Sequence, residues 1–171
     1  VAGVDVNAFM VLDYRAMAAV ADQIGRSDDA DAFRDRARRL ADAVNAHLWD
    51  AGDATYYNFD TVERSRIRRV TYSNQVALWA RLASREQARA MIEGVVLDPK
   101  KLWAPHGVRS LAADDPDYNN ENVIKPYSNW QGPIWPHANW MVMHALLHYG
   151  YPAAAIEVAT RVTRLCLADL A

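Results

Sequence analysis

The sequence predicts an all-α fold built from helical hairpins, with a short β-hairpin in one loop. Segments that are apolar on nearly every side alternate three times with helical segments that are apolar on one face only. Glycine or proline separates the segments, and the loops leading into the first kind are long and rich in aromatic residues. Such hairpins bury their faces by stacking on neighbours, as in a solenoid or a closed toroid, and the uneven loops favour a toroid.

The first predicted hairpin spans residues 6–48. Residues 6–24 place large apolar side chains on most sides, which predicts a helix that is buried on most sides. Gly25 ends this helix. Residues 28–48 begin with an aspartate-rich turn, which suits the start of a helix, and continue with one apolar and one charged face.

The second predicted hairpin follows a segment that favours strands. Residues 53–70 are rich in Thr, Tyr, Phe, Ile and Val and break the helical period, so we expect a short irregular β-hairpin there. Residues 73–81 predict a short buried helix. Ser84 and Gln87 have the spacing of a capping box and begin a one-sided helix that ends at the Asp98–Pro99 pair.

The third predicted hairpin follows a long loop over residues 99–132, which contains Pro99, Pro105, Pro116 and Pro126. Loops of this length without structure of their own are usually functional. A buried helix is expected over residues 134–149, with Pro133 and Pro136 both in its first turn and Trp140 in the core. Gly150 and Pro152 separate it from a one-sided helix over residues 152–167.

The start of the helix over residues 134–149 is the candidate binding site. We expect the side chains of Trp130, Gln131 and Trp135 to point out of this helix end. Aromatic faces stack on the C–H faces of sugars, and amides bond to hydroxyls, so the group suits a sugar, although core packing of both indoles is an open alternative. Asn139, one turn further on, is expected to brace the helix end or to reach a hydroxyl. Trp103 is expected either to line the pocket or to anchor the long loop.

Composition and charge exclude several classes of protein. The net charge of −2, without a basic stripe, argues against nucleic-acid binding. No apolar run reaches the about 18 residues needed to span a bilayer, and residues 1–10 lack the pattern of a secretion signal. The single Cys166 rules out an internal disulfide and is expected to be a small buried residue, which fits a cytoplasmic setting.

The histidines of the last buried helix do not predict a metal site. His144 and His148 have the spacing of zinc ligands. The metalloprotease motif has a Glu between its two histidines, and this sequence has none there. His137 precedes His144 by about 10 Å along the helix axis, so it could not bind the same metal ion. We therefore expect neither a metal nor a cofactor.

Two segments resemble the signature of glycoside hydrolase family 63 and its trehalase-like relatives: NWQGPIWPHANWMVMHALLHYGY and LWAPHGVRSLAADDPDY. A weaker match runs through VDVNAFMVLDYRAMAAVADQIG and covers most of the chain. Within the family, the bacterial glucosylglycerate and mannosylglycerate hydrolases are the most alike. The resemblance implies an (α/α)6 toroid with a funnel-shaped sugar site. It also implies hydrolysis with inversion by two carboxyl groups about 6.5–9.5 Å apart.

The resemblance also implies an incomplete domain. The family's acid Asp lies upstream of the region that matches Val1, and its base Glu lies beyond the region that ends at Ala171. Residues 1–171 would then form about half of one catalytic domain, without an internal boundary. They would supply Trp130, Gln131 and Trp135 to the sugar pocket but no catalytic residue, so that the chain alone is inactive and its inner apolar faces are open to water.

Partners and rival functions follow from the same reading. The expected partners are a small carbohydrate and the remaining half of the domain, and a homo-oligomer is compatible with the sequence. The main alternative is a non-catalytic helical-hairpin scaffold that binds proteins and has no affinity for sugars. A toroid with epimerase or lyase chemistry ranks third, because the aromatic helix mouth shows Trp and Gln rather than His or Tyr bases.

Overall fold

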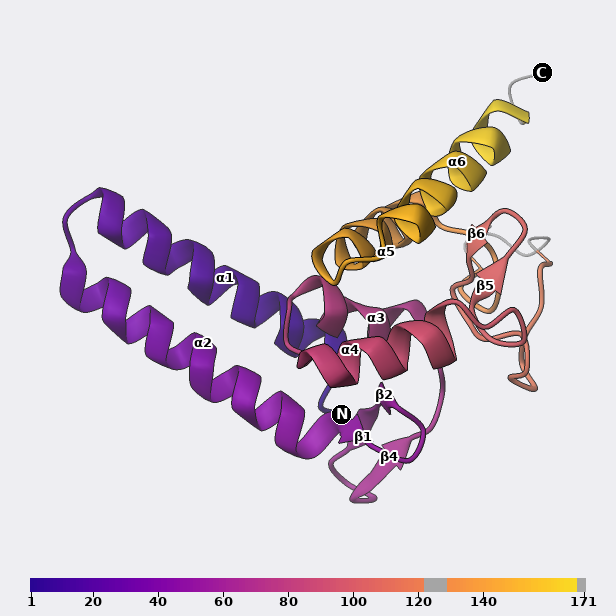
Figure 1. Cartoon of the computed structure of the whole chain (residues 1–171). Helices are drawn as coiled ribbons and strands as arrows, with labels where there is room; N and C mark the ends of the chain where they lie inside the picture. Colours follow the sequence, from indigo (N-terminus) through magenta and orange to yellow (C-terminus); the bar gives the residue numbers. More distant parts are fainter. Residues whose placement is uncertain (122–128, 169–171) are drawn as a thin grey trace.

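Three helical hairpins make up most of the computed structural model, which describes residues 1–121 and 129–168 (Figure 1). They are α1 (Val4–Gln23) with α2 (Ser27–Leu48), α3 (Tyr72–Trp79) with α4 (Arg85–Met91) and the π-helical turn η1 (Ile92–Val96), and α5 (Pro136–His148) with α6 (Pro152–Ala168). The predicted order of hairpins is confirmed, as is the capping box between Ser84 and Gln87. None of the helices in the described part of the chain is long and apolar enough to cross a membrane.

The helices that are apolar on most sides lie next to one another, with α3 between α1 and α5. Trp79 at the end of α3 illustrates this arrangement. Its ring centroid lies 5.9 Å from that of Phe9 on α1 and 5.8 Å from that of Trp140 on α5. The three helices therefore form an inner row, and α2 and α6 pack on its ends.

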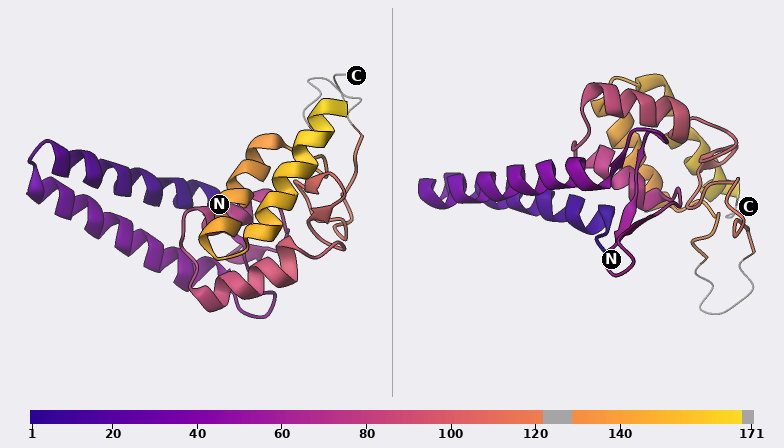
Figure 2. Two further views of the ribbon diagram at one scale, coloured as in Figure 1. Left: turned by 45° about the horizontal axis from the view of Figure 1, so that its top comes forward. Right: turned by 90° about the horizontal axis from the view of Figure 1, so that it is seen from below.

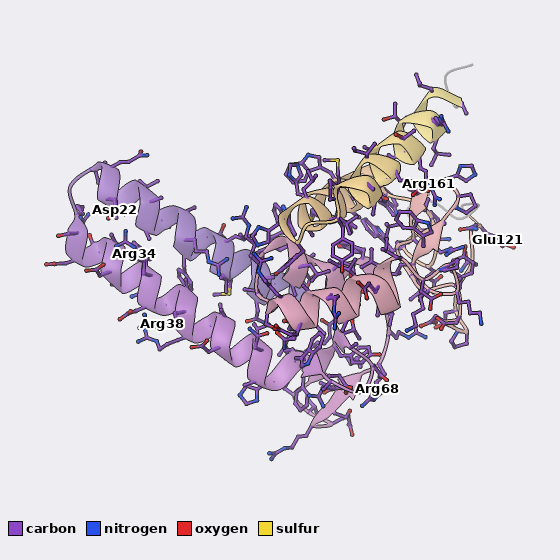
Figure 3. The ribbon with its side chains drawn as sticks, viewed as in Figure 1. Asp22, Arg34, Arg38, Arg68, Glu121 and Arg161 are labelled. Carbon is purple, nitrogen blue, oxygen red and sulfur yellow. The ribbon has the colours of Figure 1, made fainter. Side chains whose placement is uncertain are left out.

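The hairpin of α1 and α2 projects from the rest of the molecule (Figures 1 and 2). Small side chains, including Ala8, Ala18 and Ala21, are buried along α1, whose main neighbour is α2. Arg34 of α2 pairs with Asp22 of α1 near the tip (Figure 3). The hairpin is thus held together mainly by its own two helices.

The prediction that the first helix is buried on most sides was wrong for this chain. Large apolar side chains of α1 and of its C-cap residue are between 41% and 65% exposed: Val6, Met10, Met17, Val20 and the C-cap Ile24. Trp140, expected in the core, is 50% exposed. Cys166, also expected to be buried, is exposed on α6. The exposed side chains of α1 and α5 lie on faces that no described segment of the chain covers.

Short β-hairpins in the loops replace the single one that was predicted. The predicted segment contains β3 (Asn58–Asp60) paired with β4 (Ser65–Ile67), and β2 (Thr55–Tyr56) pairs with β1 (Trp49–Asp50) at the end of α2. The loop over residues 99–132, expected to lack regular structure, contains β5 (Trp103–Ala104) paired with β6 (Gly107–Val108). Each pairing is antiparallel and brief.

A short run of extended chain after β6 joins the starts of α3 and α5. The amide of Tyr72 donates to the carbonyl of Ser110 at 3.0 Å, and the amide of Ala112 donates to the carbonyl of Val70 at 2.9 Å. On the other side, the amide of Ser110 donates to the carbonyl of Pro133 at 3.3 Å. Residues 108–112 therefore fix the N-terminal ends of two inner helices relative to each other.

The start of α5 differs from the prediction by two residues. Trp135 is the N-cap and Pro136 occupies the first helical position, whereas Pro133 lies outside the helix. Pro133 is held there because its carbonyl and the neighbouring Ile134 pair with the extended run at Ser110 and Arg109. Trp130 and Gln131 consequently come from the preceding loop. Pro126, within residues 122–128, lies outside the described residues.

Replacing Gly107 with alanine should lower the free energy of unfolding by about 2 kcal/mol or more. Gly107 has φ of +138°, and an added Cβ would lie 2.7 Å from Asn139 Oδ1 and 3.0 Å from Val162 Cγ2. Gly94→Ala is the matched control, because a Cβ there meets nothing within 4 Å. Denaturant unfolding should show Gly94→Ala to be neutral or slightly stabilising. Equal effects of the two changes would contradict the packing described around Gly107.

Candidate functional site

Four aromatic rings gather where α3 and α5 begin. Trp130 and Trp135 stack face to face, with ring centroids 4.4 Å apart and an interplanar angle of 4°. Tyr72, at the start of α3, lies 4.7 Å from Trp130. His137 on α5 meets Trp130 and Trp135 edge-on, at 5.3 Å and 5.9 Å. We call these residues the ring cluster.

The ring cluster is partly open to solvent. Tyr72, Trp130 and Trp135 are half-buried, and His137 is exposed. Neither indole is fully buried, so neither has the surroundings of a core tryptophan. The cluster therefore offers an accessible apolar surface beside polar loop residues, a combination suited to a ligand with both C–H and hydroxyl groups.

The stacking of the two indoles limits how a sugar can bind. A sugar ring between them would need planes roughly 7–8 Å apart, because each carbon contact takes about 3.5–4 Å. The observed separation of 4.4 Å leaves no such space. Tyr72 already packs on the other face of Trp130, so a sugar can stack only on the outer face of Trp135.

Side-chain amides hold the loop that carries Trp130. Asn129 Nδ2 donates to Asn119 Oδ1 at 2.6 Å, and Asn119 Nδ2 donates to Gln131 Oε1 at 3.1 Å. The indole Nε1 of Trp135 donates to the carbonyl of Asn129 at 2.8 Å. Gln131 is exposed, and its Nε2 makes no hydrogen bond to any described residue, so this amide group can still donate to a ligand.

Asn139 braces the cluster from below. Its side chain is 2% exposed, and its Oδ1 accepts from the amide of Val108 at 2.7 Å. Its Nδ2 donates to the carbonyls of Val108 and Trp135, each at 3.0 Å. Asn139 was expected either to brace the helix end or to reach a hydroxyl. Its contacts are those of a brace, because both N–H groups of its amide already donate to backbone carbonyls.

Trp103 lies apart from the other predicted site residues. It belongs to β5, and the guanidinium of Arg161 on α6 lies 4.5 Å from its ring centroid (Figure 3). Its ring has no aromatic contact with the ring cluster within the described part of the chain. The contacts of Trp103 are therefore those of a loop anchor. The fold does bring Trp130, Gln131 and Trp135 together at the start of α5.

Tyr72 and His137 are members of the cluster that the sequence analysis did not single out as binding residues. His137 directly follows Pro136 in the family-like motif, so its position was available from the sequence. Tyr72 precedes the predicted helix by one residue and joins the cluster through long-range pairing with Ser110. Burial, together with the charge of Asp5, raises the pKa of the Tyr72 hydroxyl.

Asn139→Leu should reduce the free energy of unfolding by about 2 kcal/mol or more, because it leaves the amide and carbonyl of Val108 unpaired in the interior. Gln75→Met is the matched control. Gln75 is also 2% exposed, but neither of its amide atoms has a hydrogen-bond partner among the described residues. Removing that buried amide should be neutral or stabilising in denaturant unfolding. A similar loss for both variants would show that Asn139 is not the brace described.

The chain is similar to known proteins in both sequence and fold. The model of the mannosylglycerate hydrolase MGH1-like glycoside hydrolase domain matches residues 1–169. A mannosylglycerate hydrolase from Rubrobacter radiotolerans is 32% identical over 160 residues, which are 94% of this chain and 35% of that protein. The chain therefore spans about a third of the length of this relative.

Solved structures show the same fold. The family 63 mannosylglycerate hydrolase of Thermus thermophilus, in complex with Tris, has a TM-score of 0.80 and 22% identity. That match covers 95% of this chain and 37% of the Thermus chain. The neutral trehalase of Saccharomyces cerevisiae has a TM-score of 0.73 and 22% identity, with 94% of this chain and 30% of the trehalase covered.

The hairpins described above are thus part of an (α/α)6 arrangement, as the family resemblance implied. The match over residues 1–169 shows that the chain belongs to the MGH1-like glycoside hydrolase family.

Proposed function

We propose that the full-length protein is an inverting α-glycosidase that acts on a small α-glycoside, with mannosylglycerate or glucosylglycerate as the leading substrates. Residues 1–171 supply part of the sugar pocket. The observation that carries this proposal is the half-buried stack of Trp130 and Trp135 at the start of α5, in a chain that belongs to a glycoside hydrolase family.

The part played by these residues is binding rather than proton transfer. The outer face of Trp135 stacks on the hexose, and the amide nitrogen of Gln131, which has no hydrogen-bond partner among the described residues, donates to a hydroxyl. Contacts that strengthen as the sugar ring becomes oxocarbenium-like lower the barrier. The carboxylic acid that protonates the leaving oxygen and the carboxylate that activates water lie outside residues 1–171 in this proposal, so the chain alone does not turn over substrate.

The exposed apolar faces support the idea that further hairpins complete the ring. They lie on the first and last helices of the inner row: Val6 and Met17 on α1, and Trp140 on α5. Large exposed apolar patches mark surfaces that are covered in the working molecule. The remaining hairpins of the parent protein are the proposed cover. A cytoplasmic setting belongs to the same proposal, supported by the single cysteine.

The full-length protein should hydrolyse mannosylglycerate or glucosylglycerate and release the β-anomer of the hexose first, as followed by NMR. Trp135→Ala should lower kcat/KM by roughly 3- to 10-fold through lost stacking, and Trp135→Phe should restore most of it. Release of the α-anomer first would contradict an inverting mechanism. Absence of hydrolysis, together with no calorimetric binding of α-hexosides, would favour the protein-binding scaffold instead.

A further inference from the structure

The three inner helices end in the same backbone motif, but α3 ends without a glycine. Gly25 after α1, Arg81 after α3 and Gly150 after α5 have φ values of +72°, +57° and +88°. In each case the amide of this residue donates to the carbonyl three residues back, and the next amide donates to the carbonyl five residues back. Glycine is the usual residue at the left-handed position of this motif. Arg81 therefore carries a conformational cost that the two glycines avoid.

A strained backbone position of this kind calls for a reason in the side chain that occupies it. The side chain of Arg81 is exposed, and it makes no hydrogen bond or ion pair with residues 1–121 or 129–168. The contacts within the chain thus do not explain why an arginine stands where the other inner helices have glycine.

The surroundings of Arg81 are rich in positive charge. Arg15 of α1 reaches the turn between α3 and α4, where its Nη1 donates to the carbonyl of Ala80 at 2.5 Å. The end of α5 meets the same turn, because the hydroxyl of Tyr149 donates to the carbonyl of Ala83 at 3.0 Å. The ring of His148 lies 4.7 Å from that of Tyr149. We call the cationic side chains around this turn the basic cluster: Arg15, Arg81, Arg85 and His148.

The members of the basic cluster are close enough to repel one another. Burial, followed by the charge of Arg81, lowers the pKa of the Arg15 guanidinium. Burial, followed by the charges of Arg81 and Arg85, lowers the pKa of His148. The fold therefore gathers like charges from α1, α4, α5 and the turn after α3.

No carboxylate within the described ranges pairs with the three arginines of the basic cluster. Other arginines of the chain do have such partners: Arg34 pairs with Asp22, and Arg68 pairs with Asp50. Glu86, next to Arg85 in sequence, accepts a hydrogen bond from the hydroxyl of Ser84 instead. The positive charge around the turn is thus left largely unbalanced.

A simpler role for these cations is to stabilise the C-terminal ends of α3 and α5, where the helix dipole favours positive charge. Arg15 does so through its bond to the carbonyl of Ala80. The side chains of Arg81 and Arg85, however, bond to no carbonyl in the part of the chain that the structure describes. Helix capping therefore accounts for Arg15 but not for the other two arginines.

We propose that the basic cluster binds a phosphate group at the C-terminal end of α3. A guanidinium presents paired N–H donors that match the oxygens of a phosphate, and a doubly charged oxyanion balances several cations at once. Because α3 is eight residues long, this site lies about 12 Å along the helix axis from the ring cluster. The inference is therefore independent of the proposed sugar site.

The test measures thermal unfolding and calorimetric binding of the full-length protein with inorganic phosphate, against sodium chloride at equal ionic strength. We expect a Kd on the order of 1 mM or lower, and a Tm about 1–3 °C higher at a tenfold excess of phosphate over Kd. Arg81→Gly should weaken phosphate binding at least fivefold. In chloride the same variant should raise Tm by about 1–3 °C, because glycine removes the strain of the positive φ.

Arg64→Gly is the matched control. Arg64 is also exposed and has a φ of +52°, but it lies in the turn between β3 and β4, away from the basic cluster. This variant removes the same charge and the same strain, so it should raise Tm in chloride and leave phosphate binding unchanged. Arg85→Gln, which keeps the backbone of α4, should weaken phosphate binding without the gain in Tm.

Several results would overturn the phosphate site. Phosphate that stabilises the wild type no more than chloride at equal ionic strength would do so, as would undiminished phosphate binding in Arg81→Gly. Acetate that binds as tightly as phosphate would show that the cluster does not select a doubly charged oxyanion. Competition between phosphate and methyl α-mannoside would place the anion at the sugar surface instead. None of these results bears on whether the protein hydrolyses α-glycosides, so the two proposals stand or fall separately.

Discussion

The side-chain amide of Asn139 is the contact on which the rest of the site depends. It joins the first turn of α5 to both the amide and the carbonyl of Val108, at the end of β6. The chain beyond Val108 runs on to pair with the starts of α3 and α5. Because Gly107 leaves no side chain in the way, this amide can approach the backbone closely. The geometry of the ring cluster therefore depends on the buried hydrogen bonds of the Asn139 amide.

The sequence predicted the features that are set by local periodicity and capping. Alternating helix types, the capping box at Ser84 and the helical start near Pro136 are each encoded within a few residues. The grouping of Trp130 and Trp135 was also readable, because these residues are close in sequence. The exclusion of Pro133 from the helix was not readable, since it follows from pairing with Ser110 more than twenty residues away.

Other features depended on what lies next to each helix in space. An apolar helix such as α1 is expected to be buried, but periodicity cannot say which faces have partners within the chain. The same holds for Trp140 and for the face-to-face stack of the two indoles, which arises from the meeting of a loop with a helix end. Long-range packing, rather than any local signal, sets these features.

The central claim is that a hexose stacks on the outer face of Trp135 at the start of an inner helix. A crystal structure of the full-length protein with a bound hexose tests it most directly. The account predicts the sugar ring parallel to this indole, with the amide nitrogen of Gln131 within hydrogen-bond distance of a hydroxyl. A sugar bound elsewhere, with Trp130 and Trp135 enclosed among aliphatic side chains of the remaining hairpins, would contradict it.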